Sequence, residues 1–195
     1  RKIIKRLLEI NANMRVIGYT ASPFRMGHGL ITDKPAIFDA LIEPTSIEEL
    51  IYLGYLSTLR SKQPRFKHNV SGVKKRGGEY IESDLQKIVD TGDNNEKMVN
   101  EVIEKAFERK CWMFFCTGVI HAQHIADLLN SKGVASIAVT GDMPKAQREK
   151  AIEDFKLGKI KAITNVNCLS TGFDHGEIDL LVMARPTCSP GVYLQ

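Results

Sequence analysis

Polar residues follow four short apolar runs of the sequence, and their types suit contacts with phosphate groups. Threonine hydroxyls and the free N–H groups at helix starts donate hydrogen bonds to phosphate oxygens. A single such site would mean little, because the same residue types cap ordinary helices. Four at one sheet edge predict a phosphate-binding rim. They are Thr20-Ala21-Ser22, Thr117-Gly118, Thr140-Gly141-Asp142 and Thr164-Asn165.

The stretch from Lys161 to Pro186 has the form of a strand, a polar loop and a second strand. It opens on the apolar pair Ala162-Ile163, crosses a glycine-containing bend over 170–174 and returns to an apolar run over 178–183. An open α/β sheet presents ligand-binding groups in this way, at the carboxyl ends of its strands. We therefore expect this stretch to present ligand-binding groups at the edge of the sheet.

Other familiar chemistries find little support in the sequence. No GxxxxGK[ST] motif is present, and no GxGxxG follows a predicted strand. Cys116, His121 and His124 are residue types that bind zinc, but no fourth ligand stands at a recognisable spacing. Cys168 and His175 are candidates for a nucleophile and its base, yet nothing else marks a hydrolase. We expect no metal site, and we interpret the two helix histidines as surface or loop-edge residues.

Composition bounds the class of protein. With 195 residues, 43% of them hydrophobic, the chain can bury a core, and no apolar run is long enough for a membrane span. Four cysteines without a CxxC pair favour a reducing compartment, the cytoplasm. Residues 55–78 hold seven Lys or Arg and no acid. This basic segment suits a phosphate-bearing partner, and a plain solvated loop is an equally good interpretation.

The elements that must position these residues can be predicted from periodicity and capping signals. In the first part of the chain we expect a helix over 1–10, a buried strand over 14–19, an irregular loop over 24–35, a strand over 38–42, a helix capped by Ser46 and ended by Gly54, a strand followed by basic coil over 55–68, and a turn or mobile loop over 72–78. The opening helix has no start signal, so the chain resembles a piece of something longer.

A regular alternation follows. We expect helices over 82–90 and 94–110, then a strand over 111–116, a helix over 121–131, a strand over 134–139, a helix over 144–157, and strands over 160–164 and 178–183. Alternating strands and helices with short turns predict an α/β fold with a mostly parallel sheet flanked by helices. We place one domain over 55–195, the edge of a preceding domain over 1–35 and a connection over 36–54.

Taken together, the motifs resemble those of superfamily 2 helicases and translocases of the DEAD/DEAH type, near repair helicases and restriction-enzyme motor subunits. GYTASPFR at 18–25 resembles motif III, and FFCTG at 114–118 with His121-Ala122 resembles motif IV. The family's stretch with spaced Gly, Arg, Phe and Gly after motif IV has a similar counterpart here, in Thr140-Gly141-Asp142, Arg148 and FKLG at 155–158. Thr164, TGFD at 171–174 and ARPT at 184–187 resemble motif V, and Gln195 is similar to the first residue of motif VI.

The resemblance implies a RecA-like fold and a set of roles. Thr20, Ala21 and Ser22 would couple the ATP state to domain closure. Thr164, with Thr117 and the Gly141 turn, would contact nucleic-acid phosphates, and Gly172 and Asp174 would face ATP. ATP and Mg²⁺ would be the cofactors of the whole enzyme. Nucleic acid, DNA in preference to RNA, and the missing first RecA-like domain would be its partners, with no membrane involved.

This sequence also departs from the resemblance. The phosphate-binding loop and the acidic Mg²⁺ motif are missing, and the sequence stops before the arginines of motif VI. Because phosphoryl transfer needs the phosphate cradle, the metal ion and an arginine together, we expect no ATP hydrolysis by this chain alone. Two alternatives stay open: a nucleic-acid-binding RecA-like module without motor activity, and an unrelated flavodoxin-like α/β enzyme. The last predicts tight binding of a small cofactor and no salt-sensitive oligonucleotide binding.

Overall fold

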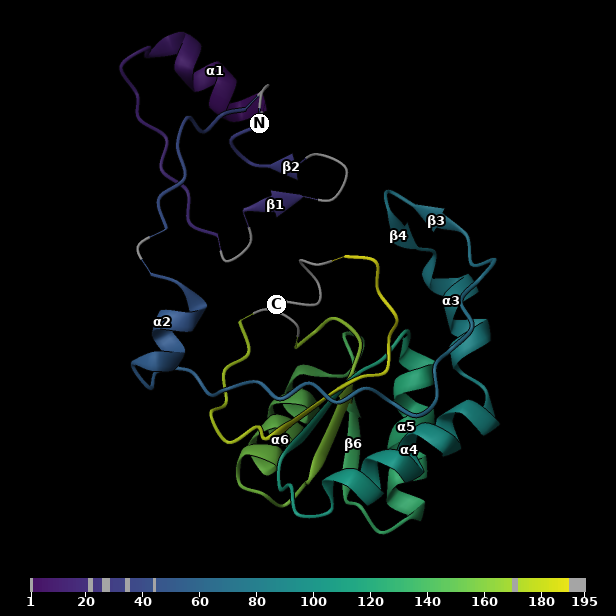
Figure 1. Ribbon diagram of the computed structural model, residues 1–195. Coiled ribbons are helices and arrows are strands. Elements are labelled where there is room, and N and C mark those ends of the chain that lie inside the picture. The colour runs from purple at the N-terminus through teal and green to yellow at the C-terminus, as the bar shows by residue number, and fades with distance from the viewer. Residues whose placement is uncertain are drawn as a thin grey trace. The chain divides into compact units, whose positions relative to one another are not determined.

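The computed structural model describes residues 2–20, 23–25, 29–33, 36–43, 45–169 and 172–189 (Figure 1). The chain forms two compact units. The first comprises Arg1–Lys62 with Ser189–Gln195, and the second comprises Gln63–Cys188.

Four short elements are found among the described residues of the first unit. These are α1 (Lys2–Ile10), β1 (Phe24–Arg25), β2 (Gly29–Leu30) and α2 (Ile47–Tyr52), with β1 and β2 paired antiparallel. The predicted cap of α2 is confirmed, because the backbone N–H of Glu49 donates to the Ser46 hydroxyl at 3.1 Å. The chain leaves this helix through Gly54, whose φ of 78° favours glycine.

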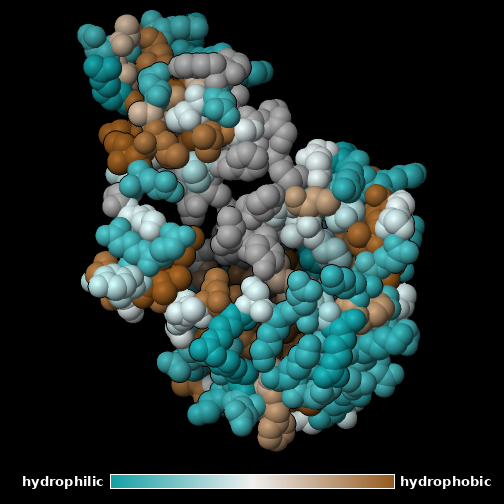
Figure 2. All heavy atoms as spheres, in the orientation of Figure 1, coloured by the Kyte–Doolittle hydropathy of each residue, from teal (hydrophilic) through white to brown (hydrophobic). Residues whose placement is uncertain are grey.

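Two strands predicted in this unit, over 14–19 and 38–42, are wrong. Both segments are irregular, and no side chain described in the unit is buried. Ile17 and Tyr19 are 80% and 97% exposed, and Figure 2 shows brown apolar side chains on the surface of this unit. The apolar pattern is that of a buried strand, but a strand needs a hydrogen-bonded neighbour, and none of the described residues supplies one.

The second unit is built on a four-stranded parallel sheet. Its strands are β5 (Trp112–Phe115), β6 (Ser136–Val139), β7 (Ala162–Asn165) and β8 (Leu180–Met183), in the order β6-β7-β5-β8. Each begins one or two residues later than predicted. The unit also contains four helices among its described residues: α3 (Glu82–Val89), α4 (Gly92–Ala106), α5 (Val119–Ser131) and α6 (Lys145–Lys156). The predicted α/β class, with helices flanking a parallel sheet, is confirmed.

Both faces of the sheet are covered, which explains why β5 is apolar throughout. Alternate side chains of a strand point to opposite faces. Trp112 and Phe114 accordingly join Val99 of α4 and Ile125 of α5 in one buried cluster, while Met113 joins a second cluster with residues of α6. No helix among the described residues is long and apolar enough to cross a membrane.

The basic segment, residues 55–78, differs from its prediction. No strand forms over 55–68, and no described strand pairs with this segment. The predicted turn over 72–78 instead contains half of a β-hairpin, in which β3 (Lys75–Arg76) pairs antiparallel with β4 (Glu79–Tyr80). Gly77 and Gly78 form its turn with φ values of 63° and 86°, the geometry that two-residue hairpins prefer.

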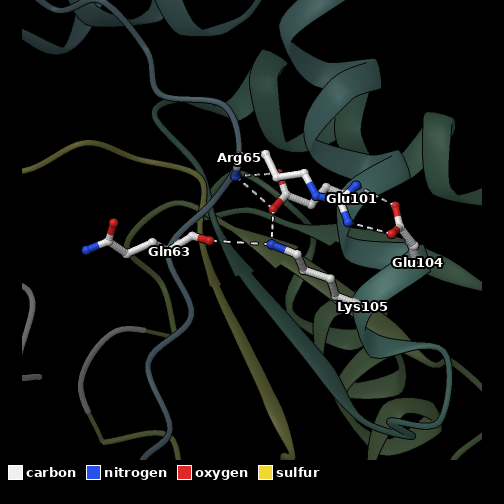
Figure 3. A network of polar contacts seen from close by, with 5 residues as sticks. All are labelled: Gln63, Arg65, Glu101, Glu104 and Lys105. Carbon is white, nitrogen blue, oxygen red and sulfur yellow. Dashed lines mark hydrogen bonds and ion pairs between the residues drawn. The ribbon is translucent and has the colours of Figure 1, made fainter.

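Arg65 of the basic segment has a structural role (Figure 3). The Arg65 guanidinium donates two hydrogen bonds, of 2.6 and 2.9 Å, to the carboxylate of Glu104 on α4. Its backbone N–H donates to both carboxylate oxygens of Glu101, and Lys105 joins Glu101 to the carbonyl of Gln63. The hydrogen bond and charge of Glu104 raise the pKa of Arg65. This network fixes the segment to α4.

Candidate nucleic-acid and nucleotide interface

The structure brings three predicted rim residues to one edge of the sheet. Thr164 lies in β7, in register with Phe114 of β5 and Ala138 of β6. Thr117 follows β5 by two residues, and Gly141 follows β6 by two residues. Because the three strands are neighbours and parallel, their carboxyl ends share an edge. This is the edge at which open α/β sheets bind ligands.

The two threonine hydroxyls at this edge bond inside the domain. Thr164 is fully buried, and its Oγ1 donates to the carbonyl of Ala122 on α5 at 2.7 Å. Thr117 is also fully buried, with its Oγ1 2.8 Å from Nδ1 of His121. Both side chains thereby attach the first turns of α5 to the strand ends. The phosphate contact predicted for them stays a prediction.

The most open of the three positions is Gly141. It is exposed, and a Cβ added there would meet no atom within 4 Å. It lies in the turn between β6 and α6, where hydrogen bonding by Thr140 lowers the pKa of Asp142. A ligand can therefore approach the backbone of this turn without displacing a side chain.

The interpretation of His121, next to the rim, as a surface or loop-edge residue is wrong. His121 is fully buried, so it is neither a surface nor a loop-edge residue. The Thr117 N–H donates to its Nδ1 at 3.2 Å, so the proton of the neutral ring is on Nε2, which has no hydrogen-bond partner in the described part of the chain. Burial lowers the pKa of His121 to about 4, although the charge of Asp90 opposes the shift.

Sequence reasoning missed the acidic group whose charge acts on this histidine. Asp90, at the end of α3, accepts a hydrogen bond from Asn95 at 2.8 Å and lies 2.9 Å from Nδ1 of His124. Burial raises its pKa, but the hydrogen bonds from His124 and Asn95 outweigh burial and hold the pKa low. A lone aspartate after a helix resembles an ordinary cap. Only the packing of α3 against α5 could have identified it.

The geometry gives no support to the metal and nucleophile alternatives. His124 is paired with Asp90, and burial raises the pKa of the Cys116 thiol. Within the described ranges no three His, Cys, Asp or Glu side chains are grouped to hold a metal ion. Cys168 donates its thiol hydrogen to the Val139 carbonyl, whereas His175 lies edge-on to Phe155. The two do not form a catalytic pair.

The candidate ATP-facing loop is fixed by the residues on either side of Asp174. Phe173 packs in the cluster of α6 and lies under the ammonium of Lys156 at 5.5 Å. His175 contacts Phe155, as described above. Gly172, with a φ of 73°, and Asp174 are both exposed. The loop thus presents the Asp174 carboxylate outwards beside the carboxyl end of α6.

The remaining predicted site residues belong to the first unit or lie outside the described residues. Thr20 is an exposed residue of the first unit. Ala21, Ser22 and Gln195 lie outside the described residues.

Comparison with known proteins supplies the family context. Residues 94–195 match the family described as "Helicase conserved C-terminal domain". A 51.5 kDa protein of a Lactococcus phage is 28% identical over 98% of this chain, which spans 41% of that protein. The putative ATP-dependent helicase IRC3 of Saccharomyces cerevisiae is 25% identical over 92% of this chain, which spans 26% of that protein.

A solved structure of S. cerevisiae Dbp5 bound to RNA and ADP BeF3 aligns with 47% of this chain and 24% of its own, at 20% identity and a TM-score of 0.43. The chain thus spans less than half the length of either of these curated relatives.

Proposed function

The chain belongs to the helicase conserved C-terminal domain family, and from that premise we propose that it is part of an ATP-dependent nucleic-acid helicase or translocase. Its parallel sheet with helices on both faces is the RecA-like fold of such a domain. The observation that carries the proposal is the shared edge of Thr117, Gly141 and Thr164. These residues lie at or just after the carboxyl ends of three neighbouring parallel strands. Their order along the chain is that of the helicase motifs that the sequence resembles.

In this proposal the nucleic-acid backbone lies along that edge. The open Gly141 turn offers its backbone N–H groups to phosphate oxygens, while the buried hydroxyls of Thr117 and Thr164 hold α5 in place behind it. Such contacts carry no base information. Our preference for DNA, and for a repair-related role in the cytoplasm, therefore depends on the subgroup of helicases that the motifs resemble.

ATP, with Mg²⁺, would lie between this domain and a first RecA-like domain that belongs to a longer protein. Gly172 and Asp174 would face the nucleotide, and Gln195 would begin motif VI. Thr20, Ala21 and Ser22 would transmit the ATP state to domain closure. We assign 1–35 to the edge of the first domain, 36–54 to the connection and 55–195 to the second domain. The break between compact units after residue 62 is compatible with a boundary in this region.

A single added charge at the rim tests the nucleic-acid part of the proposal. We expect Gly141→Glu to weaken binding of a fluorescent single-stranded DNA by about 5-fold or more, since a carboxylate there repels phosphate and one contact is lost. The fold should be unaffected, because the added side chain meets open space. Fluorescence anisotropy measures the affinity, and thermal unfolding checks the fold.

Gly176→Glu is the matched control. Gly176 is equally open and has no positive φ, but it precedes β8 at the opposite edge of the sheet. We expect this variant to bind DNA as the unaltered chain does. Equal affinities for the two variants would contradict a phosphate-binding rim.

A further inference from the structure

The β3–β4 hairpin is attached to the sheet at the same edge as the proposed rim. The Glu79 carboxylate of β4 accepts hydrogen bonds from the Thr187 hydroxyl at 2.5 Å and from the Cys188 N–H at 3.1 Å. These two residues follow the carboxyl end of β8 by four and five positions. Burial raises the pKa of Glu79, but its hydrogen bonds outweigh burial and lower it overall, so the carboxylate is charged and the attachment is intact at neutral pH.

A second contact places the neighbouring helix at this edge. Gln86 of α3 packs directly on Gly118, at the start of α5, where a Cβ would come within 2.2 Å of its Oε1. Gly118 follows β5, the neighbour of β8 in the sheet. The hairpin and α3 therefore lie at the carboxyl ends of β8 and β5, at the same edge as the rim.

The hairpin presents cations that the fold does not use. Lys74, Lys75 and Arg76 are consecutive and exposed. Lys75 lies over the Tyr80 ring at 4.9 Å, and contact with the Cys188 thiol raises its pKa. Side chains alternate along a strand, so Lys74 and Arg76 share the opposite face.

Those two side chains have no hydrogen bond or ion pair with any part of the chain that the structure describes. Arg65 differs, because its guanidinium is held by Glu104. The only acid of the hairpin, Glu79, is held by Thr187 and Cys188. Two free cations on one face of a hairpin are suited to a partner with regularly spaced negative charge.

We propose that the β3–β4 hairpin is a second nucleic-acid contact, in which Lys74 and Arg76 bind backbone phosphates of a strand that continues past the rim. The inference rests on the proposed nucleic-acid function and extends it to a surface outside the helicase motifs. A contact made by two cations to phosphates is independent of base sequence. It lengthens the bound strand and increases the salt dependence of binding.

The test compares two double variants of the 195-residue chain. Lys74→Gln/Arg76→Gln removes the two free cations of the hairpin. Arg109→Gln/Lys110→Gln removes one Lys and one Arg as well, from exposed positions before β5 at the opposite edge. Anisotropy titrations with a fluorescent oligothymidylate are made at several salt concentrations, and thermal unfolding confirms that both variants are folded.

We expect the hairpin variant to bind about 10- to 30-fold more weakly near 0.1 M salt, with a logarithmic salt slope smaller by about 1.4, as for two lost single-strand phosphate contacts. The control should keep the affinity and slope of the unaltered chain. Unchanged binding by the hairpin variant, or equal weakening of both variants, overturns the hairpin contact while the proposed function stands. Absence of oligonucleotide binding by the unaltered chain overturns both.

Discussion

Phe114→Ala is expected to lower the free energy of unfolding of the second unit by about 3–5 kcal/mol. Phe114 is fully buried in β5, which has a neighbouring strand on each side, and it packs in the cluster formed with α4 and α5. Truncation removes apolar area from the core and leaves a cavity that the surrounding elements fill only in part. Domains of this size have unfolding free energies of about 5–15 kcal/mol, so the loss is a large share of the total stability.

Phe107→Ala is the matched control for this change. The same atoms are removed, but Phe107 is 77% exposed at the end of α4. Urea unfolding followed by circular dichroism should give a change below about 0.5 kcal/mol for this variant. Equal losses in the two variants would show that the sheet does not have its core where the structure places it.

Acid is expected to destabilise the chain through His121. Its folded pKa, about 4, is below its ordinary value of 6.5. Between these two values the unfolded chain binds more protons than the folded chain, so stability is fully present above pH 6.5 and falls as the pH drops towards 4. The difference corresponds to at most about 3 kcal/mol at the acid end. Asp90 raises the pKa in part, whereas the neighbouring His68 and His124 lower it further.

Two variants separate His121 from other acid-sensitive groups. His121→Gln retains a side chain that can accept from the Thr117 N–H but cannot titrate, so unfolding free energies measured from pH 7 to pH 4 should decline less than in the unaltered chain. His175→Gln makes the same change at a partly exposed ring beside Phe155, and its decline should match that of the unaltered chain. If His121→Gln keeps the full decline, His121 is not the titrating group.

The second unit was largely predictable because its signals are local. The run CWMFFC indicates a strand that is buried on both faces, and the strand ends predict which residues meet at the carboxyl edge. Local signals fail where a partner is needed. The run MRVIGY at 14–19 has the composition of a strand, but with no neighbour to pair with among the described residues it is irregular and exposed.

The use of each rim residue depends on long-range packing. The sequence predicts that the hydroxyls of Thr117 and Thr164 face a ligand at the rim. Only the packing of α5 against the strand ends shows that both hydroxyls bond inside the domain. The basic segment is a similar case. Arg65 and Arg76 look alike in sequence, and only the position of Glu104 on α4 separates the structural cation from the free one.

ATP hydrolysis tests the central claim most directly. It should be measured, with and without DNA, for the 195-residue chain and for a full-length protein that contains it. We expect no hydrolysis by the chain alone, because the phosphate cradle and the acidic metal motif are absent from its sequence, and DNA-stimulated hydrolysis by the full-length protein. DNA-stimulated hydrolysis by the chain alone, or none by the full-length protein, would contradict the assignment of this chain as an incomplete part of a two-domain motor.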